Sequence, residues 1–164
     1  RSRRKPTGPW RAALAAALAA ALPRLAPWQV ARAAVALAKM RLAAPFTLVV
    51  GLLQSLHSRL HLASPADVAA LVWALRFVSL PYTQLLVRIH KRRLRDLAAA
   101  TQPHLGRLPA GQLVQLVEGF AGLGLLPGEE WMRLHREACL RQRARFSETN
   151  RRKIRQAYAK MWTL

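Results

Sequence analysis

The sequence predicts an all-α protein, organised as an α-solenoid segment of about four stacked helical hairpins. The first observation is a repeated pair of a small and a large residue. Its four copies are spaced by 38, 45 and 38 residues, at Ala36-Leu37, Ala74-Leu75, Gly119-Phe120 and Ala157-Tyr158. The second is that apolar residues recur at three- and four-residue steps, which is typical of amphipathic helices. The third is that no stretch alternates polar and apolar residues between turn signals, as a half-buried strand would.

The repeat predicts stacking because a single helical hairpin can bury its apolar face only against its neighbours. The small residue of each pair allows two backbones to approach closely, and the large one fills the adjacent groove. The middle spacing is longer by seven residues, which corresponds to an insertion of about two helical turns. We expect a basic arm at residues 1–8 and one helical repeat domain at residues 9–164. Its repeats are expected at about 9–44, 45–80, 81–126 and 127–164.

The first helix of each hairpin follows a proline, which fixes the backbone for a helix start or marks a break. These prolines are Pro9, Pro45, Pro81 and Pro127. The corresponding helices are expected at about Trp10–Leu22, Phe46–Leu60, Tyr82–Ala100 and Glu129–Arg145.

The second helix of each hairpin has its own start signal. Ser64 before Pro65 offers an N-cap, with Asp67 near the positive helix end, and Ser147 with Asn150 offers a weaker version. Pro27 and Pro109 supply the first-turn backbone angle in the other two. Further along the third repeat, three glycines are interpreted as a loosened helix end before Pro127; they are Gly119, Gly122 and Gly124.

The segment Ser64–Leu75, which reads SPADVAALVWAL, resembles the octotricopeptide repeat, a 38-residue helical pair found in organellar RNA-binding proteins. The resemblance covers residues 9–164 in outline and is specific over about residues 60–80. The tryptophan of the motif is Trp73, and the other repeats replace it with Val35, Glu118 and Gln156. This resemblance implies RNA binding in mitochondria, or alternatively in chloroplasts. The chain is short and very basic, and its repeats are degenerate. These features favour a structural rRNA-binding component of a mitochondrial ribosome, in contact with neighbouring ribosomal proteins.

The charge points to the same class of partner. Lys and Arg number 27 against 7 Asp and Glu, so the formal net charge is +20 on 164 residues. Such a charge repels itself in a compact protein, and a polyanionic partner relieves that repulsion. The hydrophobic fraction of 52% is high enough for a buried core, unlike that of a disordered basic tail.

Five cations are concentrated in the first helix of the third repeat, at Arg88, Lys91, Arg92, Arg93 and Arg95. Arg88, Arg92 and Arg95 are spaced four and three residues apart, so they share one stripe of a regular helix. Guanidinium groups match phosphate oxygens in a bidentate manner, and Asp96 is the single acid nearby. A solvated helix face is the alternative interpretation. We expect this stripe to bind an RNA backbone.

A second candidate RNA-binding cluster lies near the C-terminus, with Glu148 as the only acid between residues 141 and 160. Its predicted RNA-binding residues are Arg141, Arg143, Arg145, Arg151, Arg152, Lys153 and Arg155. Phe146, Tyr158 and Trp162 lie close to them. Although an aromatic ring can stack on an unpaired base, we expect each of the three to pack against the preceding hairpin.

Other chemistry finds little support in the sequence. His57 and His61 have a metal-binding spacing but no Cys, Asp or Glu within five residues, so we expect no metal. His90, His104 and His135 are interpreted as part of the basic surface, and the lone Cys139 as a buried small hydrophobe. The acids are scattered, and no apolar run spans a bilayer. We therefore expect no enzyme, no cofactor, no small-molecule substrate and no membrane partner.

Two alternatives to a ribosomal role stay open. The chain could act in trans on the maturation, stabilisation or translation of an organellar RNA. It could also be a protein-binding scaffold in a large organellar complex, with charge filling gaps in the assembly.

Overall fold

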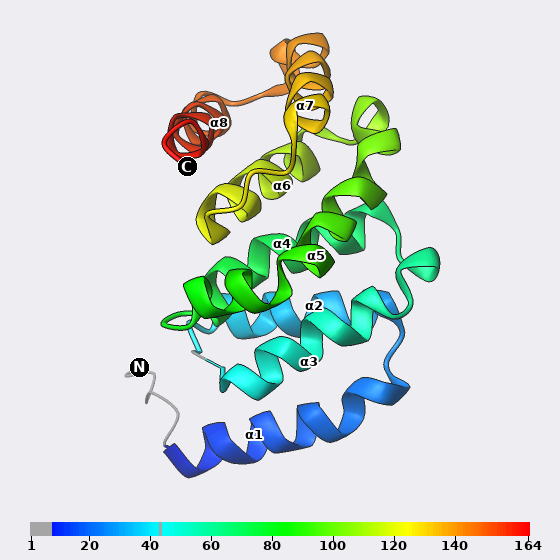
Figure 1. Cartoon of the computed structure of the whole chain (residues 1–164), viewed down its shortest axis with the longest axis vertical. Coiled ribbons are helices and arrows are strands. Elements are labelled where there is room, and N and C mark those ends of the chain that lie inside the picture. The colour runs from blue at the N-terminus through cyan, green and yellow to red at the C-terminus, as the bar shows by residue number, and fades with distance from the viewer. Residues whose placement is uncertain (1–7, 43) are drawn as a thin grey trace.

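The computed structural model describes residues 8–42 and 44–164, and this part of the chain contains eight α-helices and no β-strand (Figure 1). The predicted all-α class is therefore confirmed. Residues 1–7 of the predicted basic arm lie outside the described residues, whereas Gly8 is the first residue of α1. The helices follow one another along the long axis, from α1 at one end to α7 and α8 at the other (Figure 1).

The helices follow one another in the expected order along the chain. In chain order the helices are α1 Gly8–Ala21, α2 Pro27–Lys39, α3 Phe46–His57, α4 Pro65–Val78, α5 Thr83–Thr101, α6 Ala110–Leu123, α7 Glu129–Arg141 and α8 Glu148–Met161. The largest differences from the predicted bounds are two helix ends, since α3 ends at His57 and not Leu60, and α7 ends at Arg141 and not Arg145. In both places a short 3-10 turn continues the chain, at Leu60–Leu62 and Arg143–Arg145.

The connection inside every hairpin has the same form. A 3-10 turn follows the first helix, one residue in extended conformation ends it, and the second helix begins after one more residue. The extended residues are Leu25, Ala63, Leu108 and Phe146, with φ between −89° and −70° and ψ between 127° and 139°. They repeat the spacings of 38, 45 and 38 residues, so the internal repeat is present in the backbone as well as in the sequence.

The predicted start signals at Ser64 and Ser147 form as hydrogen bonds, and Pro27 begins α2, whereas Pro109 precedes α6 as its N-cap instead of lying in its first turn. Ser64 Oγ accepts from the Asp67 backbone N–H at 3.1 Å, and the Ser64 N–H donates to Asp67 Oδ2 at 2.9 Å. Ser147 Oγ accepts from the Asn150 N–H at 3.2 Å. The reciprocal bonds at Ser64 are a capping box, which satisfies two donors that a helix end otherwise leaves free.

The second helices of the hairpins make the most extensive contacts in the molecule, α2 with α4, α4 with α6, and α6 with α8. Gly119 and Gly122 of α6 lie directly on α4: a Cβ on Gly119 would approach Val72 Cγ1 to 2.6 Å, and one on Gly122 would approach Arg76 Cδ to 2.7 Å. Their interpretation as a loosened helix end is therefore wrong. Only Gly124 ends the helix, in the left-handed conformation with φ 70°.

The seven additional residues of the third repeat are found in its first helix. Helix α5 has 19 residues, whereas α3 has 12 and α7 has 13. Its inner side reaches the core through Leu86, Leu94 and Leu97, which are fully buried. The insertion thus lengthens the helix that carries the first predicted basic cluster.

Candidate nucleic-acid interface

The cationic side chains of α5 lie on the outside of the molecule. Arg88, Lys91, Arg92 and Arg95 are exposed, and Arg93 is half-buried. Within the described part of the chain, none of the five forms an ion pair with a carboxylate. The face formed by these five residues, here called the α5 basic face, therefore retains its full positive charge toward solvent.

Six of the seven acids of the chain are engaged elsewhere, all but Glu129. Asp96, next to the α5 basic face, receives a 2.8 Å contact from His57 Nε2 of α3. Asp67 closes the capping box of α4, and Glu118 of α6 lies between Arg76 and Lys153 at 3.5 and 3.7 Å. Glu130 and Glu137 both hold Arg133 within α7.

Helix α5 bends in the middle of the predicted stripe. His90 has the non-helical angles φ −113° and ψ 22°, and its side chain is buried. Arg93 Nη1 donates to His90 Nδ1 at 2.7 Å, which fixes this guanidinium beside the bend. Burial, with a smaller effect from the charge of Arg93, lowers the pKa of His90. His90 is thus not part of the basic surface as predicted, and Arg88 precedes the bend while Arg92 and Arg95 follow it.

The C-terminal cluster has a different electrostatic environment. Glu148 pairs with Arg155 at 2.8 Å and with Arg151 at 3.8 Å, and Lys153 faces Glu118. The remaining predicted residues of the cluster are exposed and in no ion pair among the described residues: Arg141, Arg143, Arg145 and Arg152. Arg141 is turned toward the 3-10 turn Gln102–Arg107, where its Nη2 lies 3.0 Å from the Cβ position of Gly106.

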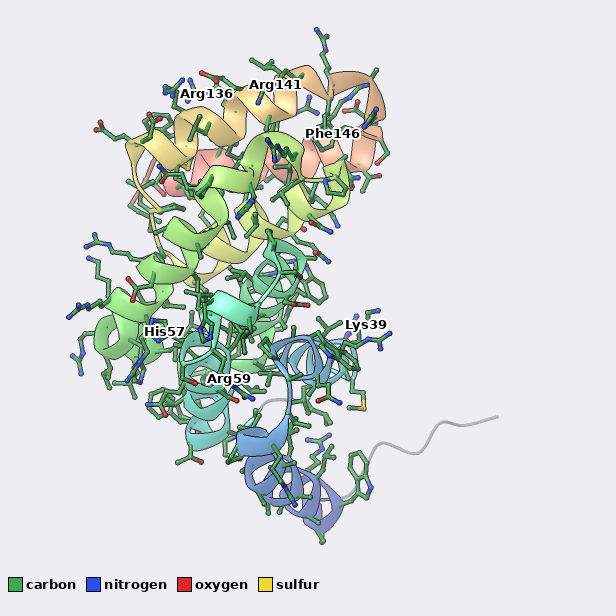
Figure 2. All side chains as sticks on the ribbon, turned by 90° about the vertical axis from the view of Figure 1, so that its right-hand side faces the viewer. Lys39, His57, Arg59, Arg136, Arg141 and Phe146 are labelled. Atoms are coloured by element: carbon green, nitrogen blue, oxygen red, sulfur yellow. The ribbon has the colours of Figure 1, made fainter. Side chains whose placement is uncertain are left out.

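The two clusters belong to different hairpins. Helix α5 packs mainly on α3, α4 and the turn that follows it, whereas α8 packs on α6. In Figure 2, Arg136 and Arg141 lie at the end of the molecule formed by α7, and His57 and Arg59 lie near its middle.

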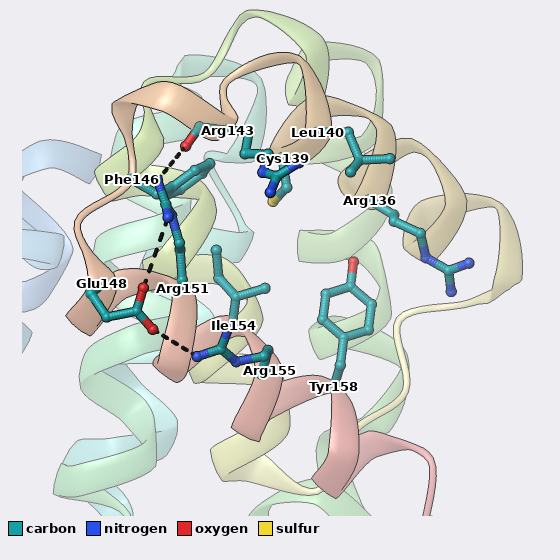
Figure 3. A pocket seen from close by; sticks show the side chains of 10 residues that line it. All are labelled: Arg136, Cys139, Leu140, Arg143, Phe146, Glu148, Arg151, Ile154, Arg155 and Tyr158. Carbon is teal, nitrogen blue, oxygen red and sulfur yellow. Dashed lines mark hydrogen bonds and ion pairs between the residues drawn. The ribbon is translucent and has the colours of Figure 1, made fainter.

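Part of the C-terminal cluster surrounds a groove of about 490 Å³ between α7 and α8 (Figure 3). The apolar side chains on its wall are Leu140, Ile154, Phe146 and the ring of Tyr158, with Cys139 beside them. Charged side chains at the groove are Arg136, Arg143, Arg151, Arg155 and Glu148. The sequence prediction missed Arg136, Leu140 and Ile154. Aligning α8 with α6 through the repeat could have found Ile154, since it occupies the position of the buried Leu116.

Beneath this groove, His135 joins three helices. Its ring stacks on Trp131 with centroids 4.9 Å apart, Nε2 lies 2.9 Å from the Leu113 carbonyl oxygen, and Nδ1 lies 2.8 Å from the Tyr158 hydroxyl. A carbonyl only accepts, so the network assigns the proton to Nε2, and Nδ1 accepts from Tyr158. Burial lowers the pKa of His135 to about 4, against a smaller opposing effect of the Leu113 carbonyl. His135 is therefore a buried neutral residue and not part of the basic surface.

The three C-terminal aromatic residues differ in exposure. Phe146 is buried and Tyr158 is half-buried in the His135 network, in agreement with the expected packing. Trp162 is 74% exposed, so for this residue the expectation is wrong. Cys139 is half-buried, and burial raises the pKa of its thiol to about 12, which keeps it protonated at neutral pH.

The described residues include no group of three or more His, Cys, Asp or Glu side chains that could hold a metal ion. Among the same residues, no helix combines the length and the apolar character needed to cross a bilayer. Comparison of the chain with protein-family models, curated proteins and solved structures gives no match in any of the three.

Proposed function

We propose that this protein binds RNA through the α5 basic face and acts as a structural rRNA-binding component of a mitochondrial ribosome. The observation that carries the proposal is that five neighbouring cations have no carboxylate partner among the described residues, although the chain has seven acids. Unpaired, exposed guanidinium groups are the natural ligands of a phosphate backbone.

The construction of α5 supports an RNA contact. This helix is lengthened by seven residues relative to α3, and its exposed residues in that stretch are mainly cations. Its inner side is anchored in the core by Leu86, Leu94 and Leu97. The cations are therefore displayed on a helix that the core holds on both sides of the bend at His90, which reduces the ordering required when they bind a phosphate backbone.

The wider architecture and the cellular place belong to the same proposal. We infer an α-solenoid segment, because each hairpin repeats the same connection and the second helices pack in series. The octotricopeptide-like segment Ser64–Leu75 supports an organellar RNA partner. The short, degenerate and highly basic chain favours a ribosomal component over a factor that acts in trans.

The experiment is equilibrium binding of the full chain to a labelled 20-nucleotide single-stranded RNA. The test variant replaces three exposed cations of the α5 basic face, Arg88→Glu, Arg92→Glu and Arg95→Glu. The control variant makes the same charge change at exposed positions of α1 and α2, Arg11→Glu, Arg32→Glu and Lys39→Glu. We expect the test variant to bind at least about 30-fold more weakly, roughly 2 kcal/mol, since three charge-assisted contacts are lost.

Equal losses in the two triple variants would show that only net charge matters and would contradict a site on α5. Absence of RNA binding by the wild-type chain would contradict the function itself. The ribosomal part is tested by sedimentation of the native protein. We expect migration with a large particle that RNase releases, whereas migration as a small free protein would favour a factor acting in trans.

A further inference from the structure

Each of the first three hairpins holds the first helix of the next one. Helix α3 packs against α1 and α2, α5 packs against α3 and α4, and α7 packs against α6 and the 3-10 turn that ends α5. The corresponding place beyond the fourth hairpin, between α7 and α8, is the groove of about 490 Å³. In the rest of the molecule, therefore, the equivalent place is filled by an α-helix.

Part of the groove wall corresponds to a surface that holds a helix in the third hairpin. With the 38-residue spacing, Ile154 and Tyr158 of α8 occupy the positions of Leu116 and Phe120 of α6. Phe120 is where α7 docks in the third hairpin, with its ring 5.4 Å from that of Trp131. The fourth hairpin thus presents the Tyr158 ring at the position where α7 docks in the third, with the apolar Ile154 one helical turn away.

The apolar surface continues beyond the groove. A second hollow of about 350 Å³ shares Arg136 with the first and lies between the start of α7 and the end of α8. Its apolar walls include Leu126, Trp162 and Leu164, which are exposed, as is Leu140 of the first groove. The two hollows together follow the length of α8, whose 14 residues correspond to about 20 Å of helix.

The charges at this surface specify the partner. Where α6 has the fully buried Leu113 and Val117, α8 has Arg151 and Arg155. Four arginines and one glutamate surround the first groove. A helix lying there would need apolar residues on one side and carboxylates along its edges to complement those arginines.

We propose that the surface between α7 and α8 binds an acidic amphipathic α-helix of a partner protein. This binding site is separate from the α5 basic face and does not depend on RNA binding there. RNA fits the groove less well, because the aromatic rings on its wall are already held in place. Phe146 is buried, and the Tyr158 hydroxyl is hydrogen-bonded to His135. The Arg136 guanidinium lies over the Tyr158 ring, with Cζ 5.9 Å from the ring centroid.

The test uses a labelled peptide derived from α7, the helix that fills the equivalent place in the third hairpin. The probe is residues 128–142 with Arg133→Glu, Arg136→Glu and Arg141→Glu, held helical by a lactam bridge on its solvent side. The unmodified α7 sequence with the same bridge is the control peptide. We expect the acidic peptide to bind the full chain saturably and the control peptide to bind at least about tenfold more weakly, since its arginines oppose those of the groove.

Two exposed leucines provide a matched pair of protein variants. Leu140 in the groove is 65% exposed and Leu62, in a 3-10 turn outside the groove, is 64% exposed. Leu140→Glu is expected to weaken acidic-peptide binding at least about tenfold, and Leu62→Glu to leave it within about twofold. Circular dichroism shows whether both variants keep the fold.

Three results would overturn the proposal: no saturable binding of the acidic peptide, equal binding of both peptides, or equal effects of the two leucine variants. The single-stranded 20-nucleotide RNA distinguishes the other class of partner. If that RNA displaces the acidic peptide and Leu140→Glu weakens RNA binding by the same factor, the groove is an RNA site. We expect Leu140→Glu to leave RNA affinity unchanged.

Discussion

Helices α6 and α8 occupy equivalent positions in their repeats but differ in what surrounds them. Helix α6 packs against α4 on one side and α8 on the other, and its Leu113 and Val117 are fully buried. Helix α8 makes its extensive contacts with α6 and touches α7 through Tyr158, and the residues equivalent to Leu113 and Val117 are Arg151 and Arg155, at the edge of a groove. Positions that follow the repeat therefore form the core of the molecule. Positions that depart from the repeat form the surfaces that we assign to partners.

The largest expected effect comes from exchanging these equivalent residues. Leu113→Arg places a charge in a fully buried position between helices, and we expect a loss of more than about 3 kcal/mol of unfolding free energy. Arg151→Leu changes a half-exposed position, and its effect is expected to stay within about 1 kcal/mol. Urea unfolding followed by circular dichroism measures both. Similar losses in the two variants would contradict the difference in burial.

The next effect concerns His135, which connects α6 and α8 through Leu113 and Tyr158. Its pKa is lowered to about 4 in the folded protein, against about 6.5 in the unfolded chain. Between these two values the unfolded chain therefore binds a proton that the folded protein does not, which favours unfolding. The contribution of His135 to the unfolding free energy is therefore complete above about pH 6.5. It decreases as the pH falls from about 6.5 to about 4, by about 3 kcal/mol in total. Unfolding free energies measured between pH 4 and 7 test this. His135→Gln, which can keep both hydrogen bonds, should flatten this dependence, and an unchanged pH profile would show that His135 is not its source.

A smaller effect is expected from Tyr158→Phe, which makes α8 resemble α6, where Phe120 stands. The change leaves His135 Nδ1 without its hydroxyl donor at a buried site, and we expect a loss of about 1–2 kcal/mol. Tyr82→Phe is the matched control, because Tyr82 is exposed and no such bond joins its hydroxyl to a buried ring. Equal thermal stability of both variants would argue against the His135 network.

The smallest effect is expected for Glu148→Ala. Its carboxylate is 72% exposed, and ion pairs at such sites contribute about 0.5 kcal/mol. Glu148 is nevertheless the one acid at the groove between α7 and α8. The change should therefore barely alter the melting temperature while it strengthens binding of the acidic α7 peptide. A weaker complex would contradict the role assigned to the groove arginines.

Much of the fold could be predicted because the signals are local. The capping box at Ser64 and the prolines before the first helices depend on neighbouring residues, and their helices form close to the expected bounds. The role of Gly119 and Gly122 could not be predicted, because a glycine can either end a helix or allow a neighbouring helix to approach closely. Only the contact with α4 distinguishes the two.

The candidate sites were less predictable because they depend on distant residues. The five cations of α5 are clustered in the sequence, but their lack of partners depends on Asp96, which contacts His57 of another hairpin. The bend at His90 has no counterpart in the regular spacing that suggested a straight stripe. His135 looks like a surface residue until its stacking on Trp131 is known.

The most direct test of the central claim is the salt dependence of RNA binding by the wild-type chain and by the triple variant Arg88→Glu, Arg92→Glu and Arg95→Glu. If the five cations of the α5 basic face contact phosphates of single-stranded RNA, the slope of log K against log salt is about −3.5. Loss of three contacts should reduce its magnitude by about 2. An unchanged slope in the variant would contradict RNA binding by α5.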